Sequence, residues 1–162
     1  MSSASGVMPA GGVVASAQLF APLNADPLLH SSTFAGSPLA AAAVTATIGT
    51  IESEGLVGRA RELGPQVRDL AAAAVATHCP HLVTEVRGQG LLIGIDFVSA
   101  EAATEFLIGL LDSRVIPSYS LNAGHVLRLT PPAILDTADL DWLGRALTSA
   151  ARHVSRVVPA AA

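Results

Sequence analysis

The sequence predicts an α+β fold in which helices cover a small sheet, forming a two-layer sandwich. Three observations predict it. Apolar residues recur at helical spacing over 37–78 and again from about residue 136 onward. Between these segments the residues follow period-two or continuous β-type patterns. One further helical stretch, 101–111, interrupts them. The strands are therefore expected beside one another, with the helices on one face.

Two helices are expected in the first half of the chain. Ser37 can cap the first, and Pro38 suits its first turn, because no amide hydrogen is needed there. The second helix is expected over 56–78. It carries Gly64 and Pro65 in its interior, where a proline costs about 3 kcal/mol, so a kink or a break is expected at that step.

The second half is expected to contribute four strands and a last helix. The strands are expected over 82–88, 90–98, 113–119 and 124–132. Gly88, Gly90 and Gly94 do not form a dinucleotide fingerprint, since a strand follows them where that site needs a helix, so they are turn and packing glycines. Asp136 or Thr137 caps the last helix.

The N-terminal segment, residues 1–29, is interrupted by prolines and glycines and is expected to be irregular, with at most one short strand at 11–16. It lacks the positively charged start of a signal peptide. No run in the chain approaches the roughly 18 apolar residues of a membrane span. The sequence therefore predicts a cytoplasmic protein with no membrane partner.

The composition is unusually apolar. Of the 162 residues, 51% are hydrophobic and 14% are charged, whereas ordinary soluble domains carry about 25% charged residues. One explanation is that a partner chain, or protein outside these 162 residues, covers part of the apolar surface. The other is a simple bias toward alanine, and both stay open.

The charges exclude two kinds of chemistry. The net charge of −4 comes without a basic block, so nucleic acid is not expected as a partner. All nine cationic residues are arginines, and the sequence contains no lysine. No side chain of these 162 residues can therefore form a Schiff base with an aldehyde cofactor.

No metal site is expected. His78, Cys79 and His81 lie within four residues, but a structural zinc site takes four ligands, usually in two separated pairs, and there is no second pair. The segment is better explained as a loop that ends a helix. Cys79 is the single cysteine, which excludes an internal disulfide.

The loop HSSTFAGSP, residues 30–38, is a candidate anion site. It ends at the start of a helix, where free amide hydrogens and the helix dipole favour negative charge. Ser32 and Thr33 are among its hydroxyl donors. An ordinary hydroxyl-rich loop capped by Ser37 explains the spacing as well, and that alternative stays open.

Two arginines lie in predicted strands. Arg128 is flanked by Leu127 and Leu129, so it needs an anionic partner if it is buried. That partner could be a substrate carboxylate or an internal Asp or Glu, and solvent at a sheet edge is the third possibility. For Arg87 we expect a structural ion pair.

Four segments together resemble a known family. They are GVMPAGGVVAS, DPLLHSSTFAGSPLAAAA, EVRGQGLLIGIDF and VLRLTPP, in this order. They resemble the C-terminal part of class III aminotransferases, which are fold-type I enzymes dependent on pyridoxal phosphate. The acetylornithine, ornithine and putrescine aminotransferases are the most similar group. The resemblance extends from Gly6 to about Val154.

The resemblance implies roles for three residues. Thr33 matches a threonine that reaches across a dimer interface to the cofactor phosphate, and Ser32 is a second possible donor. Arg128 matches the arginine of an R-x-x-P-P segment, which pairs with the substrate α-carboxylate. A guanidinium suits that role because it offers two parallel donors to two oxygens. No catalytic residue and no metal ligand is assigned.

The resemblance also implies a domain division. Residues 1–36 would be an irregular segment left over from the large cofactor-binding domain and would include the phosphate-contacting loop. Residues 37–156 would form a helical linker and the small C-terminal α+β domain, and 157–162 a frayed tail. The family's Schiff-base lysine would fall at about Met1, so only part of the pyridoxal phosphate site is expected.

The resemblance therefore predicts a C-terminal fragment of an aminotransferase that acts on amino acids or on diamines such as ornithine-type substrates. Without the lysine it is expected to be inactive alone, and to need the missing N-terminal portion or a homodimer partner. Two alternatives stay open. One is a non-catalytic oligomerisation or anion-binding module derived from the enzyme, and the other is a truncated gene product.

Overall fold

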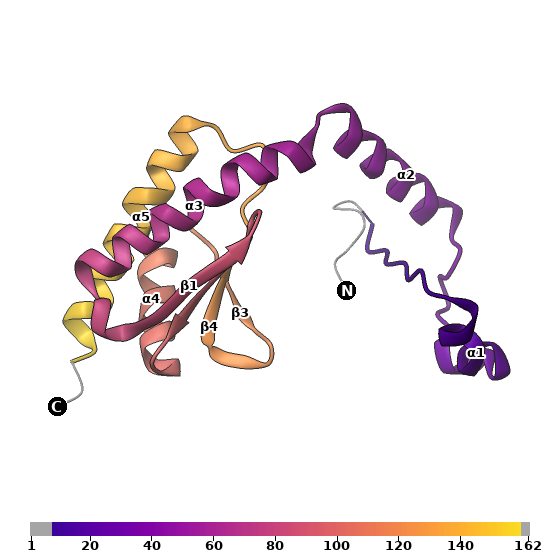
Figure 1. Ribbon diagram of the computed structural model, residues 1–162, viewed down its shortest axis with the longest axis horizontal. Helices are drawn as coiled ribbons and strands as arrows, with labels where there is room; N and C mark the ends of the chain where they lie inside the picture. The colour runs from indigo at the N-terminus through magenta and orange to yellow at the C-terminus, as the bar shows by residue number, and fades with distance from the viewer. Residues whose placement is uncertain (1–7, 160–162) are drawn as a thin grey trace. The chain divides into compact units, whose positions relative to one another are not determined.

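The chain divides into two compact units, Met1–Gly55 and Leu56–Ala162. A computed structural model describes residues 8–159, apart from the side chains of Pro27 and His30 (Figure 1). The domain division after residue 36 stays a prediction. No helix within residues 8–159 has both the length and the apolar content that crossing a bilayer requires.

The N-terminal unit is more helical than the sequence predicts. Residues 11–16 form no strand, and α1 (Ala17–Ala25) and the 3-10 helix η1 (Pro27–His30) occupy the segment that was expected to be irregular. Ser16 caps α1, since its hydroxyl accepts a hydrogen bond from the Leu19 amide at 3.4 Å. Pro22 lies inside α1. Because proline is unfavourable in the interior of a helix, the sequence pattern did not predict α1.

Helix α2 (Pro38–Ser53) confirms the first expected helix. Pro38 is its first residue, and Ser37 occupies the N-cap position, although the Ser37 hydroxyl makes no capping hydrogen bond. The turn after α2 contains Gly55 with a φ of 61°. Neither α1 nor α2 buries any of its described residues.

The C-terminal unit begins with α3 (Leu56–His78), which runs through Gly64 and Pro65 without a break. The expected break does not occur. Gly64 is buried, and a β-carbon at this position would overlap the backbone of Gly90 in the hairpin packed against it. This position requires a glycine because the backbone of the hairpin approaches α3 closely.

Four antiparallel strands form one sheet in the order β1-β2-β4-β3. The strands are β1 (Val83–Gln89), β2 (Leu92–Phe97), β3 (Ser118–Ser120) and β4 (Ala123–Leu129). Gly90 and Leu91 join β1 to β2, and a positive φ at Gly90 alone is the pattern of a type II′ turn. The strand expected over 113–119 is shorter than predicted, because it follows a turn at Arg114 (φ 60°) and begins only after Pro117.

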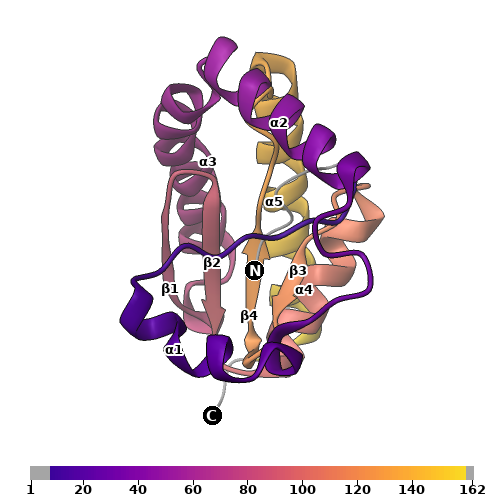
Figure 2. The same cartoon turned by 90° about the vertical axis from the view of Figure 1, so that its right-hand side faces the viewer.

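Three helices cover one face of this sheet (Figure 2). Helices α3 and α4 (Ala100–Asp112) contact the strands, and α5 (Thr137–Val157) packs against both helices. Asp136 caps α5 through a capping box with Asp139, which settles the choice between Asp136 and Thr137. The predicted two-layer α+β fold is confirmed.

The core lies between the sheet and the helices. Ile93, Ile95 and Phe97 point into it from β2, and Phe97 packs against Phe106 of α4 with ring centroids 5.1 Å apart. Helix α5 extends to Val157, the first residue of the tail that was expected to fray, and for residues 160–162 that expectation stays a prediction. Val158 is buried, and residues 160–162 lie outside the described residues.

The contact between α3 and the hairpin can be tested with two glycines of the same helix. We expect Gly64→Ala to lower the free energy of unfolding by about 1–3 kcal/mol, because the added carbon overlaps a backbone that cannot rotate away. Gly58→Ala is the control. No atom lies within 4 Å of its β-carbon position, so alanine should stabilise the helix by about 0.5–1 kcal/mol. Urea unfolding of both variants measures the difference, and equal effects would contradict the close approach.

Candidate functional site

The register of the sheet places two arginines on its outer face. Leu127 and Leu129 point into the core, so Arg128 between them points to the face that the helices do not cover. Arg128 pairs with Gly94 of β2, and Gly94 pairs with Arg87 of β1. A row of side chains thus crosses the outer face from β1 to β4.

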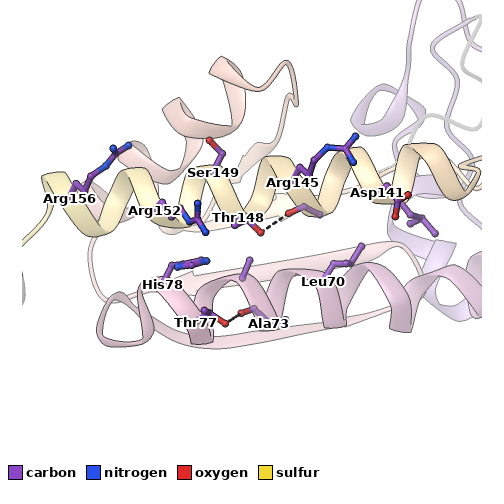
Figure 3. Close-up of a pocket in the computed structure, with 13 residues that line it drawn as sticks. Leu70, Ala73, Thr77, His78, Asp141, Arg145, Thr148, Ser149, Arg152 and Arg156 are labelled. Atoms are coloured by element: carbon purple, nitrogen blue, oxygen red, sulfur yellow. Dashed lines mark hydrogen bonds between the residues drawn. The ribbon is translucent and has the colours of Figure 1, made fainter.

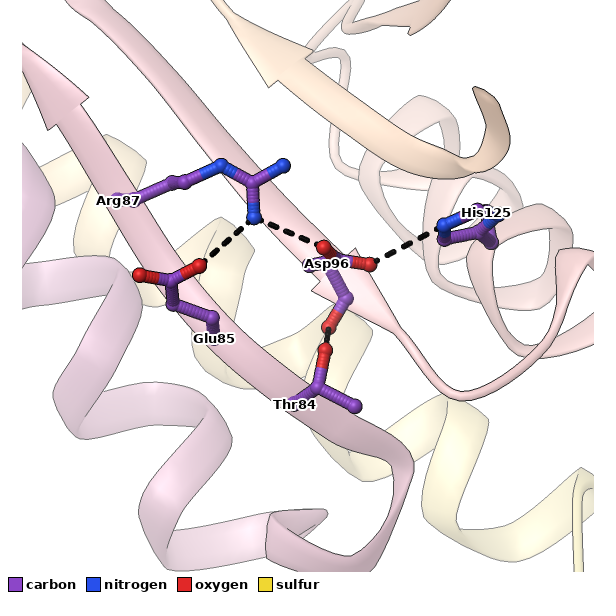
Figure 4. A network of polar contacts seen from close by, with 5 residues as sticks. All are labelled: Thr84, Glu85, Arg87, Asp96 and His125. Carbon is purple, nitrogen blue, oxygen red and sulfur yellow. Dashed lines mark hydrogen bonds and ion pairs between the residues drawn. The ribbon is translucent and has the colours of Figure 1, made fainter.

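Arg87 is the centre of a polar network (Figure 4). Its Nη1 donates to Asp96 Oδ2 at 2.8 Å and to Glu85 Oε2 at 2.9 Å. On the other side of Asp96, His125 Nε2 lies 3.5 Å from Oδ1. The hydrogen bonds to Asp96 and Glu85 raise the pKa of Arg87 further above its usual range. The structural ion pair expected for Arg87 is therefore present.

Arg128 has no such partners. Its Nε is the only buried side-chain nitrogen or oxygen of the described residues that lacks a hydrogen-bond partner. No Asp or Glu bonds to it, and the neighbouring carboxylate of Asp96 is already bonded to Arg87. Of the three predicted explanations, an internal Asp or Glu is wrong. A buried donor without a partner is costly, which favours an external anion.

The loop before α2 combines two features of an anion site. The Ala35 amide donates to the Ser32 carbonyl at 2.9 Å, which forms a tight turn just ahead of the helix. The hydroxyls of Ser32 and Thr33 are exposed and bond to no residue that the structure describes. Because the Ser37 hydroxyl does not cap α2 and Pro38 has no amide hydrogen, the Leu39 and Ala40 amides are the ones left free of a side-chain acceptor. Hydroxyl donors and free amides suit a phosphate.

The two candidate sites belong to different units. Ser32 and Thr33 lie in the unit that ends at Gly55, and Arg128 lies in the unit that begins at Leu56. Each site is therefore described within its own unit. The residues that would read a carboxylate sit on a sheet with a buried core, whereas the hydroxyl donors sit on a loop with no core beneath it.

A groove of about 810 Å³ lies between α3 and α5 of the C-terminal unit (Figure 3). Arg152 of α5 and His78 of α3 face each other across it. Its threonine hydroxyls serve their own helices, since Thr77 donates to the Ala73 carbonyl and Thr148 to the Gly144 carbonyl. The groove lies on the helical layer, and Arg128 is not among the residues that line it.

Sequence reasoning considered Gly94 only as a turn or packing glycine, and it did not single out Asp96, His125 or Ser118. They matter only because strand pairing brings them beside Arg87 and Arg128. One signal was available, because the two-residue turn after Gln89 fixes the pairing of Arg87 with Gly94. The pairing of β4 with β2, in contrast, joins two segments that α4 and β3 separate in the sequence, whereas Ser118 lies on β3, directly before β4.

Cys79 lies in the core rather than at a ligand site. It is fully buried, and this burial raises its pKa to about 11. Across residues 8–159 the structure contains no group of three His, Cys, Asp or Glu side chains that could hold a metal ion. The segment around Cys79 ends α3 and starts the short 3-10 helix η2 (Pro80–Leu82).

The missing partner of Arg128 predicts an unusual stability effect. Arg128→Met should raise the free energy of unfolding by about 1 kcal/mol, because it removes a buried donor that has no acceptor. Arg87→Met is the matched control and should leave stability unchanged or slightly lower, since it breaks an exposed ion pair. Thermal unfolding in a buffer without carboxylates measures both. Destabilisation by Arg128→Met would show that the guanidinium has a structural partner.

The buried thiol predicts slow alkylation. At pH 8 Cys79 should react with iodoacetamide only through unfolding, because the reactive thiolate is scarce well below a pKa of about 11 and the sulfur is inaccessible. In about 6–8 M urea, where the chain is unfolded, the rate should rise to that of a free thiol. Mass spectrometry follows the modification. Fast native alkylation would place Cys79 outside the core.

Comparison with known proteins relates this geometry to a family. The sequence model described as aminotransferase class-III matches residues 2–151. The ornithine aminotransferase of Toxoplasma gondii is 25% identical, with a TM-score of 0.70 over 87% of this chain and 32% of that chain. The acetylornithine aminotransferase of Elizabethkingia anophelis is 27% identical, with a TM-score of 0.64 over 75% of this chain and 31% of that chain.

A transaminase from the marine bacterium Virgibacillus shares the fold, with a TM-score of 0.78 at 24% identity over 96% of this chain and 38% of that chain. The chain thus spans about a third of the length of the solved aminotransferases that it matches. The family match covers nearly all of the sequence, and both candidate sites lie within it. The chain belongs to the class III aminotransferases.

Proposed function

We propose that this chain forms the C-terminal part of a pyridoxal-phosphate-dependent aminotransferase that acts on amino acids or on diamines of the ornithine type. The observation that carries the proposal is the buried, unpartnered Nε of Arg128 on the open face of the sheet. The ornithine and acetylornithine aminotransferases among the structural neighbours support the substrate class. The structure of the Toxoplasma gondii enzyme holds pyridoxal phosphate at its active site, at partial occupancy.

In this proposal Arg128 binds the substrate carboxylate. Its guanidinium offers parallel donors that match two carboxylate oxygens, and its charge does not depend on pH. Asp96 cannot compete for Arg128 while it is bonded to Arg87. The network around Arg87 therefore keeps the neighbouring carboxylate occupied and leaves Arg128 for a ligand.

Thr33 and Ser32 are the residues that would hold the cofactor phosphate. Their hydroxyls are exposed and have no partner among the described residues, which fits a phosphate oxygen. Pyridoxal phosphate, when bound, supplies the electron sink that amino transfer requires. The 162 residues contain no lysine, so the amine that tethers the cofactor must come from another segment or chain.

A partner surface is part of the proposal. In the N-terminal unit Val14 is 100%, Leu28 82% and Phe34 81% exposed, and neither α1 nor α2 buries a described residue. Apolar side chains this exposed favour a covering surface. We assign that surface to the N-terminal portion of an aminotransferase and to a second copy in a dimer.

Reconstitution tests this function. The purified chain with pyridoxal phosphate, ornithine or N-acetylornithine, and 2-oxoglutarate should show no turnover beyond that of the free cofactor. When the chain replaces the matching C-terminal third of the Elizabethkingia anophelis enzyme, turnover should appear. Arg128→Ala should then reduce kcat/KM by about 10–100-fold, the cost of losing charge-assisted hydrogen bonds.

Two further variants separate the roles. Thr33→Ala should weaken cofactor affinity about tenfold, as expected for the loss of one hydrogen bond to a charged group, with little change in KM for the amino acid. Thr45→Ala is its control, because that hydroxyl is exposed and only bonds its own helix at Ala41. Turnover by the chain alone would contradict the proposal. An inactive hybrid in which Arg128 still binds carboxylates would favour the non-catalytic module.

A further inference from the structure

Gly94 has no structural reason to be a glycine. It lies inside β2, one of the two inner strands, and pairs regularly with Arg87 on one side and with Arg128 on the other. Its φ is not in the left-handed region. A β-carbon there would meet Val126 Cγ1 at 3.6 Å and Arg87 Cγ at 4.0 Å, which are ordinary contacts.

Other buried or turn glycines differ in this respect. Gly64 and Gly88 would place a β-carbon on a neighbouring backbone, and Gly88 also has a φ of 155°. A glycine inside a strand costs about 0.5–1 kcal/mol relative to alanine. It often marks a bulge or a place that a ligand approaches. The irregularity in the β1–β2 pairing lies between Val83 and Glu85, away from Gly94, so the second explanation remains.

The residues around Gly94 leave space beside Arg128. No atom of Arg128 lies within 4 Å of the β-carbon position, so the space between the two residues is not filled by the guanidinium. On the other side of Arg128 stands Ser118 of β3, a small exposed residue whose hydroxyl bonds to no described residue. The unpartnered Nε of Arg128 is thus flanked by small residues on both neighbouring strands.

The two arginines of this row are not equivalent. Arg87 is compensated by Glu85 and Asp96, at 2.9 and 2.8 Å, whereas Arg128 has no counter-ion. Asp96 lies one step further along the outer face of β2, and its carboxylate is already bonded to Arg87 and has no donor to offer an anion. An anion that binds Arg128 is therefore expected to lie above Gly94 rather than above Asp96.

We propose that Gly94 is a specificity-determining residue of the carboxylate site: its missing side chain keeps open the approach by which a carboxylate reaches Arg128. The inference rests on the proposed role of Arg128. The size of residue 94 then decides how much bulk beside the carboxylate the site accepts, because residue 94 is the cross-strand partner of Arg128 on the same face of the sheet.

The test follows the Nε–Hε resonance of Arg128 by NMR in the full 162-residue chain, labelled with ¹⁵N-arginine and titrated at fixed ionic strength. Acetate is the small probe and pivalate the bulky one. We expect both to shift the wild-type resonance, which Arg128→Met identifies by its absence. Gly94→Ala should weaken acetate binding about threefold and Gly94→Val about tenfold or more, the equivalent of one charge-assisted hydrogen bond. Pivalate should be affected more strongly than acetate.

Gly124→Val is the matched control. Gly124 is an exposed glycine of the adjacent strand β4 with no atom within 4 Å of its β-carbon position, so its replacement should leave both affinities unchanged. Valine suits a strand, and unchanged spectra elsewhere would show that each variant folds. Should Gly94→Val fail to fold, Gly94→Ala decides, since its added carbon makes only ordinary contacts.

The outcomes separate this inference from the proposed function. If the wild-type resonance of Arg128 responds to neither anion, the carboxylate role of Arg128 fails, and the inference fails with it. If the wild type responds and Gly94→Val and Gly94→Ala respond with the same affinity, the role of Arg128 stands and that of Gly94 is overturned. Equal weakening of acetate and pivalate would remove the steric explanation.

Discussion

The register of β2 determines both faces of the sheet. Because side chains alternate along a strand, the pairing that turns Ile93, Ile95 and Phe97 toward the helices also turns Gly94 and Asp96 outward. A slip of one residue would exchange these two sets and bury a carboxylate in the core. The type II′ turn at Gly90 and the close packing of that glycine on α3 both oppose such a slip. The apolar core and the polar outer face thus depend on one arrangement of hydrogen bonds.

The two arginines of the outer face are paired unequally with acidic residues. Arg87 takes the carboxylates of both Glu85 and Asp96, and these bonds leave no acid for Arg128. A fully paired face would be more stable, because a buried donor without an acceptor costs about 1–3 kcal/mol. The fold accepts this cost at one position only among the described residues. Such a local conflict, where the other buried side-chain nitrogen and oxygen atoms of the described residues have partners, is typical of a binding residue rather than of a packing residue.

The sequence predicts the elements whose patterns are long and unbroken. Helices α2, α3 and α5 and the β1–β2 hairpin follow from periodicity and turn residues. Helix α1 was not predicted because it is short and contains Pro22, and β3 was overestimated because Pro117 delays its start. The residues around Arg128 predict that this arginine lies in a strand, but they do not predict that its Nε lacks a hydrogen-bond partner. That property arises from cross-strand pairing, which commits Asp96 to Arg87. The roles of Ser32 and Thr33 came from resemblance alone, since their spacing also fits an ordinary loop.

The two candidate sites differ in how much packing within this chain supports them. Arg128 is positioned by a sheet whose inner face packs on α3 and α4, and the residues that hold the register are buried. The loop of Ser32 and Thr33 is positioned by local hydrogen bonds within a unit whose helices bury none of their described residues. Local bonds of this kind fix a turn but not its orientation toward a ligand, since rigid placement needs packed side chains behind it. In the proposed function, carboxylate recognition therefore depends on this chain's own core, whereas phosphate recognition depends on the surface proposed to cover the N-terminal unit.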